Sequence, residues 1–210
     1  MSRRAFWLVA FCVAAVFCWL FPPFHVVPLR HAQERRQQAA FDASAFAAEF
    51  WEKQLLPATG RAVPVTDLLA ALAQEPDAAR KRLGRSPGLS ATTFFFVRGA
   101  GRIASVEKDG LRIALEGAAA QPAVVLVMGL LFGNAVRDAT GLLSGSDFPN
   151  SQDFNAISTE LNRLVETRVL PDMRARAAVG KTIRFTGCLE LEEDAAPSIL
   201  RVVPVKVEWP

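Results

Sequence analysis

Cysteine and histidine are scarce in this sequence, and their scarcity limits the chemistry that the chain can carry. There are three cysteines, Cys12, Cys18 and Cys188, and two histidines, His25 and His31. Cys12 and Cys18 lie within an apolar run and Cys188 within a predicted strand, so no disulfide pair inside one domain is obvious. The histidines follow the apolar run, far from the polar segments. The fold is therefore expected not to rest on disulfides, and either redox compartment is allowed.

The common catalytic and cofactor motifs are also missing. No HExxH, CxxC or GxSxG pattern occurs. The glycine-rich pieces Gly99-Ala100-Gly101 and Gly141-Leu142-Leu143-Ser144-Gly145 match neither a P-loop nor a dinucleotide fingerprint. The sequence thus predicts no cofactor and no metal site, and it leaves enzymatic activity undecided.

The chain also has almost no excess of one charge sign over the other. The chain has 24 Lys and Arg against 21 Asp and Glu, a net charge of +3, and Arg3 and Arg4 account for most of the difference. Proteins that bind nucleic acid usually concentrate positive charge. Phe94-Phe95-Phe96 beside Arg98 and Arg102 resembles a base-stacking strand, but alternation would bury part of the trio. We expect no nucleic-acid partner.

What the sequence does have is an apolar N-terminal run. Arg3-Arg4 precedes seventeen uninterrupted apolar residues, Ala5 to Phe21, the short end of a membrane span. We predict an uncleaved signal-anchor; a cleaved signal peptide and a buried helix are the alternatives. No A-x-A cleavage pattern follows, and the phenylalanines before Cys12 and Cys18 make poor lipid-attachment sites.

The orientation of this anchor follows from its flanks. Arg3 and Arg4 favour a cytoplasmic N-terminus, against competition from Arg30, Arg35 and Arg36. A short first tail and a large trailing domain place the remainder outside. The expected location is the inner membrane, with a single pass through residues 5–21 and a periplasmic C-terminal domain.

Residues 31–90 are predicted to form a helical segment. Phe41, Ala45, Ala48 and Leu55 recur near helical spacing within 33–56, and Pro57 is expected to end that helix. A second helix should begin at Thr66 or Asp67 and run to Leu83, with Gly84 as its stop and 85–90 as a linker. The predicted organisation is an anchor in 1–30, helices in 31–90 and a β-domain in 91–210.

The β-domain has the element order of an OB-type barrel. The predicted elements are strands at 92–106, 111–116 and 122–132, a helix from about 150 to 170 ended by Pro171, and strands at 181–189 and 198–207. Glycines in the first strand indicate a bulge or a sharp bend, and Pro204 indicates an edge position. The fold class predicted is α+β, a five-stranded OB-like Greek-key barrel with a helix between strands 3 and 4. An open antiparallel sheet with helices on one face is the alternative.

Unusual polar residues crowd into positions 133–166. On the predicted helix, Asn155, Thr159, Asn162 and Glu166 fall on one face, roughly 60° wide, opposite an apolar stripe. Asn is a poor helix former, and amides suit sugar hydroxyls or another protein's backbone. A solvated face or structural hydrogen bonds to adjoining loops are the alternatives. The candidate binding residues are Asn134, Arg137, Asp138, Asn150, Asp153, Asn155, Thr159, Asn162 and Glu166.

Arg137 and Asp138 are neighbours in a loop framed by glycines, and as neighbours they need not pair. Arg137 is expected to offer its planar fork to another carboxylate, Asp153 or Glu160, which would pin the loop to the helix. Binding of an anionic or hydroxylated ligand is the other interpretation.

Two motifs carry a resemblance to a known family: Gly133-Asn134-Ala135-Val136-Arg137-Asp138-Ala139-Thr140-Gly141 and Asp147-Phe148-Pro149-Asn150-Ser151-Gln152-Asp153-Phe154-Asn155-Ala156-Ile157-Ser158. With support from 46–56 and 202–205, the chain resembles, over roughly 40–208, a bacterial family of unknown function described as predicted periplasmic lipoproteins. The resemblance implies a periplasmic, membrane-tethered protein whose gene lies beside sugar ABC-transporter genes. It implies no catalytic residues.

Two functions remain open at this stage. The first is a non-enzymatic binding or accessory protein that contacts a transporter component or a small hydroxylated ligand. The second is a hydrolase acting on a carbohydrate-like substrate with a pair of carboxylates from Asp138, Asp147, Asp153, Glu160 and Glu166.

Overall fold

The computed structural model describes residue 7 and residues 41–88, 91–116, 124–193 and 199–210. The predicted anchor, residues 5–21, lies outside the described residues apart from Trp7. Among the described residues, no helix combines the length and apolarity needed to cross a bilayer. Residues 42–210 form one compact unit, and the predicted boundary near residue 90 stays a prediction.

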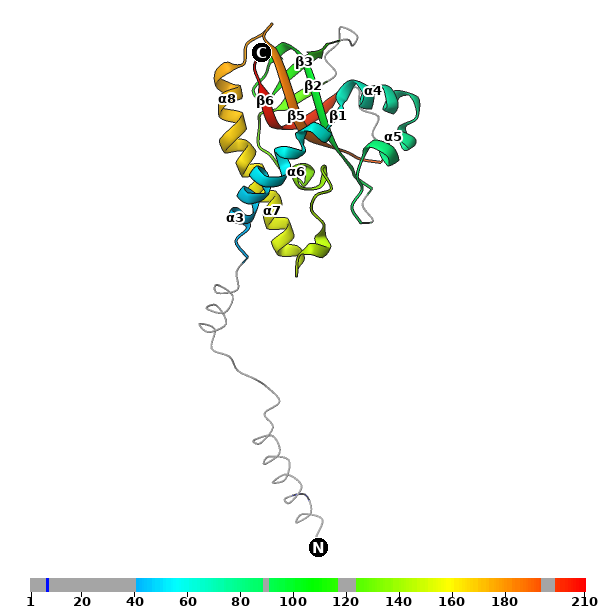
Figure 1. Cartoon of the computed structure of the whole chain (residues 1–210), viewed down its shortest axis with the longest axis vertical. Coiled ribbons are helices and arrows are strands. Elements are labelled where there is room, and N and C mark those ends of the chain that lie inside the picture. The colour runs from blue at the N-terminus through cyan, green and yellow to red at the C-terminus, as the bar shows by residue number, and fades with distance from the viewer. Residues whose placement is uncertain (1–6, 8–40, 89–90, 117–123, 194–198) are drawn as a thin grey trace. The chain divides into compact units, whose positions relative to one another are not determined.

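Five strands form a closed barrel (Figure 1). They are β2 (Thr93–Val106), β3 (Gly110–Leu115), β4 (Val124–Val127), β5 (Thr182–Leu191) and β6 (Leu200–Glu208). The strand order is β2-β3-β4-β6-β5, and β5 pairs back onto β2. β4 and β6 run parallel while the other barrel pairs are antiparallel. The predicted α+β Greek-key barrel is confirmed, and the open sheet is wrong because the β2–β5 pairing removes both edges.

β2 closes the barrel because it is long enough to pair with two strands. Thr93 to Arg102 pairs with β5, and Gly101 to Val106 pairs with β3. A Cβ at Gly101 would lie 2.3 Å from the carbonyl oxygen of Ala114 in β3, so glycine permits the close approach of β3 to β2. A bulge or sharp bend is predicted at the glycines; the register shift lies instead between Ile103 and Ser105, just beyond Gly101.

The last two strands behave as their sequences indicate. The β5–β6 register shifts between Thr186 and Gly187, and Gly187 lies opposite Pro204. Pro204 lies beyond the part of β6 that pairs with β4, which ends at Val202. The proline's missing N–H therefore interrupts no ladder on that side. β6 itself lies between β4 and β5, so the predicted edge position holds only for this unpaired side of the end of the strand.

The helical region before the barrel is more broken than predicted. It comprises α3 (Ala43–Phe50), a π-helical turn (Trp51–Leu55), a 3-10 helix (Pro57–Arg61), α4 (Val65–Gln74) and α5 (Pro76–Leu83). The first helical stretch ends at Leu55, just before Pro57 as predicted, and Pro57 begins a separate 3-10 helix. The single helix predicted for residues 66–83 is wrong, because Pro76 starts a new helix after Glu75 adopts a non-helical conformation.

A two-residue strand that was not predicted, β1 (Val63–Pro64), adds a sixth strand to the sheet. It pairs in parallel with β2 at Val97 and Arg98. This pairing holds the start of α4 against the barrel and so builds one wall of the cavity described below.

The connection from β4 to β5 is helical. It contains α6 (Ala135–Asp138), a 3-10 turn (Gly145–Asp147), α7 (Ser151–Leu164), a π-helical segment (Val165–Val169) and α8 (Leu170–Arg176). The expected stop at Pro171 is wrong: Pro171 occupies the first turn of α8, where a missing N–H costs little. The apolar stripe predicted for this helix comprises Phe154, Ile157, Leu161, Leu164 and Val165, and all of these are buried except Phe154, which is half-buried.

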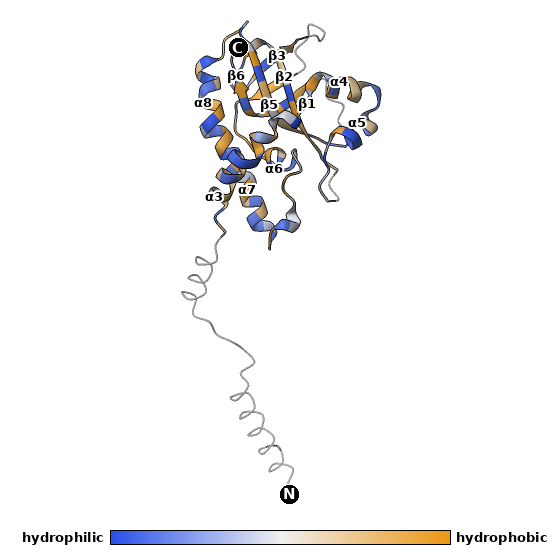
Figure 2. Ribbon diagram, in the orientation of Figure 1, coloured by the Kyte–Doolittle hydropathy of each residue, from blue (hydrophilic) through white to orange (hydrophobic). Residues whose placement is uncertain are grey.

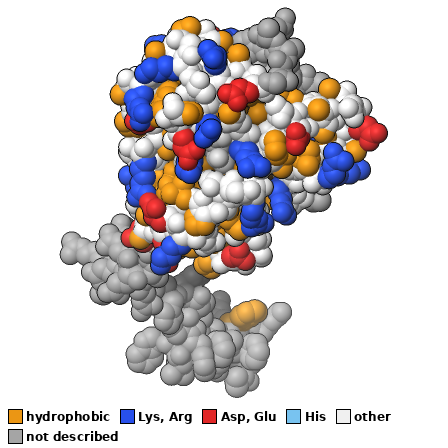
Figure 3. Space-filling model, turned by 45° about the horizontal axis from the view of Figure 1, so that its top comes forward, with side chains coloured by type: hydrophobic (Ala, Val, Ile, Leu, Met, Phe, Trp, Pro, Cys, Tyr) orange, Lys and Arg blue, Asp and Glu red, His pale blue; other side chains and the backbone are white. Residues whose placement is uncertain are grey.

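The core lies inside the barrel and beneath α7. Its largest fully buried side chains include Phe50, Phe95, Leu126, Ile157 and Leu170. Apolar strands contrast with the hydrophilic α5 in Figure 2, and the face in Figure 3 mixes both signs of charge. Phe94, Phe95 and Phe96 are all buried, so none of these rings is available for base stacking.

Candidate functional site

Arg137 and Asp138 form a buried ion pair with each other. Nε of Arg137 donates to Oδ1 of Asp138 at 2.7 Å, and Nη2 donates to Oδ2 at 2.9 Å. Both residues are 5% exposed. The prediction that Arg137 pairs with Asp153 or Glu160 is therefore wrong, because the short helix α6 turns the two neighbouring side chains together.

The remaining donors of Arg137 tie α6 to α7. Nη1 donates to the Phe154 carbonyl at 3.2 Å and to Oδ1 of Asn155 at 3.1 Å. The guanidinium also lies 3.7 Å from the centroid of the Phe154 ring, a cation–π geometry. The hydrogen-bond partners of the Arg137 guanidinium thus lie within the protein. This agrees with the interpretation that Arg137 pins the loop to the helix.

Two further candidates pin the loop that precedes α6. Nδ2 of Asn162, which is 8% exposed, donates to the Gly133 carbonyl at 3.1 Å. Oε1 of Glu166 accepts from the backbone N–H of Leu131 at 3.3 Å. On the predicted polar face of the helix, Asn155 and Thr159 are therefore exposed. Asn162 and Glu166, further along, contact the loop.

The last candidates cap helices. Oδ1 of Asn150 accepts from the Asp153 N–H at 2.8 Å, and Nδ2 of Asn150 donates to the Asp153 carboxylate at 2.8 Å. Asn134 occupies the N-cap position of α6 and makes no capping hydrogen bond there. Most of the nine candidates thus serve the loop–helix joint, and a binding role for the exposed Asn155 and Thr159 stays a prediction.

The carboxylates considered for hydrolysis have separate structural partners. Asp138 pairs with Arg137, Asp147 completes a capping box with Ser144, Asp153 joins the α7 cap, Glu160 pairs with Arg163, and Glu166 binds the Leu131 N–H. None of the five lines the cavity described next. The geometry therefore offers no support for a carboxylate-dependent hydrolase built from them.

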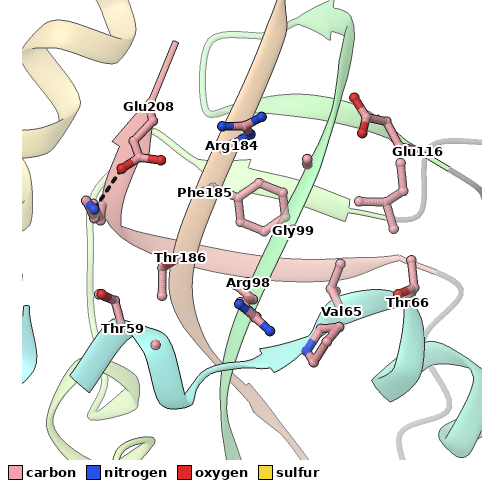
Figure 4. A pocket seen from close by; sticks show the side chains of 15 residues that line it. Thr59, Val65, Thr66, Arg98, Gly99, Glu116, Arg184, Phe185, Thr186 and Glu208 are labelled. Atoms are coloured by element: carbon pink, nitrogen blue, oxygen red, sulfur yellow. Dashed lines mark ion pairs between the residues drawn. The ribbon is translucent and has the colours of Figure 1, made fainter. Parts of the chain in front are cut away.

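A cavity of about 530 Å³ lies between the barrel and the β1–α4 segment (Figure 4). Its size falls in the range usual for small-molecule sites. Strands β2, β5 and β6 form one wall, while the 3-10 helix, β1 and the start of α4 form the other. Its polar lining consists of Thr59, Thr66, Arg98, Glu116, Arg184, Thr186, Lys206 and Glu208.

Strand register sets the polar groups of this wall in two rows. Arg98 lies opposite Thr186, which in turn lies opposite Lys206. In the second row, two residues further along β2, Ala100 lies opposite Arg184, and Arg184 lies opposite Glu208. Arg98 and Arg184 are therefore diagonal neighbours on adjacent strands, close enough for long side chains to reach one ligand.

Some charged side chains of the cavity are paired with each other, and others form no ion pair among the described residues. Lys206 and Glu208 form an ion pair of 2.7 Å, drawn as a dashed line in Figure 4. The Lys206 ammonium lowers the pKa of the exposed Glu208 carboxyl below its ordinary value. Among the described residues, neither Arg98 nor Arg184 has a side-chain hydrogen bond or an ion pair. Both are exposed, and the positive charge of Arg184 also contributes to the lowered pKa of Glu208.

The floor of the cavity between the two arginines is apolar and tightly packed. Gly99 lies opposite Phe185, whose ring occupies the space beside the glycine. A Cβ at Gly99 would lie 2.7 Å from the Phe185 ring and 2.8 Å from a Val65 methyl. Glycine at this position therefore lets the α4 start and the barrel meet.

Sequence reasoning missed this cavity, although a signal for it exists. In β5, Arg184 and Thr186 alternate with the buried Ile183 and Phe185, which marks an outward polar face. Arg98 was considered only as a partner for base stacking. The wall formed by β1 could not be predicted from the sequence, because a strand of two residues is too short to show a period-two pattern.

The fold defines the class of the protein. A solved OB-fold protein from Thermotoga maritima is similar, with 26% sequence identity and a TM-score of 0.73, over 81% of this chain and 99% of that chain. No curated protein matches.

The family follows from the sequence. The family described as predicted periplasmic lipoprotein (DUF2291) matches residues 12–208. The chain belongs to this family, whose function is unknown, and the resemblance noted from the two motifs is confirmed. The implied link to sugar-transporter genes stays a prediction.

Proposed function

We propose that this protein is a membrane-tethered periplasmic binding protein that holds a small hydroxylated carboxylic acid, of the sugar-acid class, in its barrel cavity. The observation that carries the proposal is the pair Arg98 and Arg184. Both side chains line the cavity (Figure 4), and among the described residues neither makes a side-chain hydrogen bond or an ion pair. An arginine fork matches the planar geometry of a carboxylate.

The rest of the lining suits hydroxyl groups. Thr59, Thr66 and Thr186 provide hydroxyls that both donate and accept, and Glu116 provides an acceptor. Val65 and Phe185 supply an apolar surface between the polar groups. A ring or chain that carries several hydroxyls and one carboxylate would satisfy each of these features.

The charge balance of the cavity favours acids over neutral sugars. Glu208 is neutralised by Lys206, which leaves two arginines against the single carboxylate of Glu116. A neutral sugar would leave both guanidinium groups without a charged partner. The structure of the site thus supports discrimination by charge as well as by shape.

The tether and the partner complete the proposal. The family description supports a membrane-associated periplasmic location, and residues 5–21 would provide the tether, as a membrane span or through a lipid. A transporter component that receives the bound acid is the proposed partner, in keeping with a protein that binds rather than converts its ligand.

Isothermal titration tests the proposal. The full chain would be titrated in a polyoxyethylene detergent, which has no sugar headgroup, with uronic and aldonic acids and with the parent neutral sugars. We expect at least one acid to bind roughly tenfold or more tightly than its neutral parent. Arg98→Gln and Arg184→Gln should each weaken that binding by a similar factor.

Arg102→Gln is the matched control, because Arg102 is an exposed arginine on the same strand outside the cavity lining. It should leave the affinity for the acid unchanged. Equal affinity for acid and neutral sugar, or an Arg98→Gln variant that binds the acid normally, would overturn the proposed function.

A further inference from the structure

A second cavity, of about 350 Å³, has a lining whose charged residues are all basic. It lies between the end of the 3-10 helix, the end of α5 and the loop that follows α6. Its charged residues are Arg61, Lys81, Arg82 and Arg85, and no carboxylate is among the lining residues. The chain as a whole has a net charge of only +3, so this lining concentrates more positive charge than the overall composition does.

The four cations do not serve one helix terminus. Lys81 and Arg82 lie in the last turn of α5, where positive charge stabilises the helix dipole. Arg61 instead ends the 3-10 helix, and Arg85 follows α5. Among the described residues, none of the four has an ion pair or a side-chain hydrogen bond. Like charges that converge without a counter-ion repel one another, and an anion would remove that repulsion.

Arg85 is held in place on both sides. Its backbone forms an antiparallel bridge with Phe94, with N–H to carbonyl distances of 2.8 Å in both directions. Its side chain passes over Gly141, where a Cβ would lie 2.9 Å from the Arg85 Nε. Gly141 has a φ of +64°, so glycine is required both by the backbone and by the arginine. The backbone of Arg85 is therefore fixed, and the contact with Gly141 limits the directions that its exposed side chain can take toward a ligand.

Thr140 adds a donor to the same cavity. Its side chain lines the cavity and is 7% exposed. Its hydroxyl oxygen accepts from the Leu142 N–H at 3.3 Å, which leaves the hydroxyl hydrogen available for donation. Thr140 and Gly141 end the motif whose Arg137 anchors α6, so the joint between α6 and α7 also positions this wall.

From these contacts we infer that the second cavity binds a phosphate group. A phosphate carries up to two negative charges and several acceptor oxygens, which matches convergent arginines, a lysine and a hydroxyl better than a single carboxylate does. The group could belong to a soluble phosphate compound or to the headgroup of an anionic phospholipid. The site is separate from the cavity proposed for the sugar acid, since the two share no lining residue.

The test uses the full chain in the same detergent and separates the two sources. One arm titrates inorganic phosphate and pyrophosphate. The other adds water-soluble dihexanoyl phosphatidylglycerol, with dihexanoyl phosphatidylcholine for comparison. We expect binding in at least one arm, weakened about tenfold or more in Arg85→Gln and in Arg61→Gln. Tighter binding of phosphatidylglycerol than of phosphate assigns the site to lipid; the reverse assigns it to a soluble compound.

Arg98→Gln is the matched control, because it removes one exposed arginine from the other cavity. It should bind phosphate probes like the wild type while it loses the sugar acid. Absence of binding in both arms would overturn the inference. So would wild-type affinity in Arg61→Gln and Arg85→Gln together, or an equal loss in Arg98→Gln. Thermal melting of each variant confirms that these exposed substitutions leave the fold intact.

Discussion

Arg137 donates hydrogen bonds to both carboxylate oxygens of Asp138, the next residue in the chain, and neither side chain is more than 6% exposed. The pair lies in a helix of four residues, too short to be stable alone. Its position therefore depends on the contacts that Arg137 makes with α7. The motif Gly133–Gly141 is best understood as the joint between the barrel's β4 and its connecting helix.

Removing the guanidinium should destabilise the protein strongly. Arg137→Met leaves the Asp138 carboxylate buried without its partner, and we expect the free energy of unfolding to fall by about 3–5 kcal/mol. Urea denaturation followed by circular dichroism measures the change. Arg163→Met, which breaks an exposed pair with Glu160, should cost less than about 1 kcal/mol. Similar losses in the two variants would contradict the role of the buried pair.

Glu190 should weaken the fold as the pH rises. Burial raises the pKa of this carboxyl, and the negative charges of Glu192 and Asp138 raise it further. Between the ordinary glutamate pKa, about 4.3, and the raised value, the folded state binds more protons than the unfolded state. Stability therefore falls as pH rises through that window.

Glu190→Gln removes this pH dependence. The variant should be more stable than the wild type at neutral pH, and the two should converge as the pH falls below the ordinary glutamate value. Urea midpoints measured from pH 3.5 to pH 8 provide the comparison. A variant that is less stable than the wild type at neutral pH would show that the carboxylate makes a favourable contact instead.

Cys188 should be chemically silent in the folded protein. The thiol is fully buried, and burial raises its pKa far above the usual range, which disfavours the reactive thiolate. We expect its alkylation by iodoacetamide to be more than about 100-fold slower in the native protein than in urea. Peptide mapping by mass spectrometry follows Cys188 separately from Cys12 and Cys18. Rapid native labelling would contradict the packing of β5.

Gly99 should tolerate no side chain. A Cβ there would lie 2.7 Å from the Phe185 ring, and Gly99→Ala should cost about 1–3 kcal/mol through overpacking. Thermal melting and urea denaturation measure the loss. Gly60→Ala is the control, because a Cβ at Gly60 meets nothing within 4 Å. A Gly99→Ala variant as stable as the control would show that the α4 start moves freely away from the barrel.

The barrel could be predicted because period-two patterning survives in β3 and in parts of β5 and β6, while β4 is a short, continuously apolar strand that is buried throughout. Leu111, Ile113 and Leu115 are buried as their alternation indicates. The order of strands and helix along the chain then leaves only a few possible topologies. The broken helices were missed for a local reason: Pro76 and Pro171 each occupy the first turn of a new helix, where proline is favourable rather than disruptive.

The candidate site was harder to predict than the fold. The amides and the arginine of the central segment were correctly singled out, yet Arg137 and Asn162 are occupied by Asp138 and the Gly133 carbonyl. Whether a polar side chain faces a ligand or a neighbouring loop depends on tertiary contacts. Arg98 and Arg184 become neighbours only through the β2–β5 register, which the sequence does not specify.

The strand β6 (Leu200–Glu208) also bears on aggregation. Its first part, Leu200 to Val202, pairs with β4, and its later part, Val203 to Glu208, pairs with β5. Loss of this one strand, for example by proteolysis, would leave unpaired N–H and C=O groups on both β4 and β5. Exposed strand edges of this kind are templates for pairing with other chains, so the protein with β6 removed should aggregate.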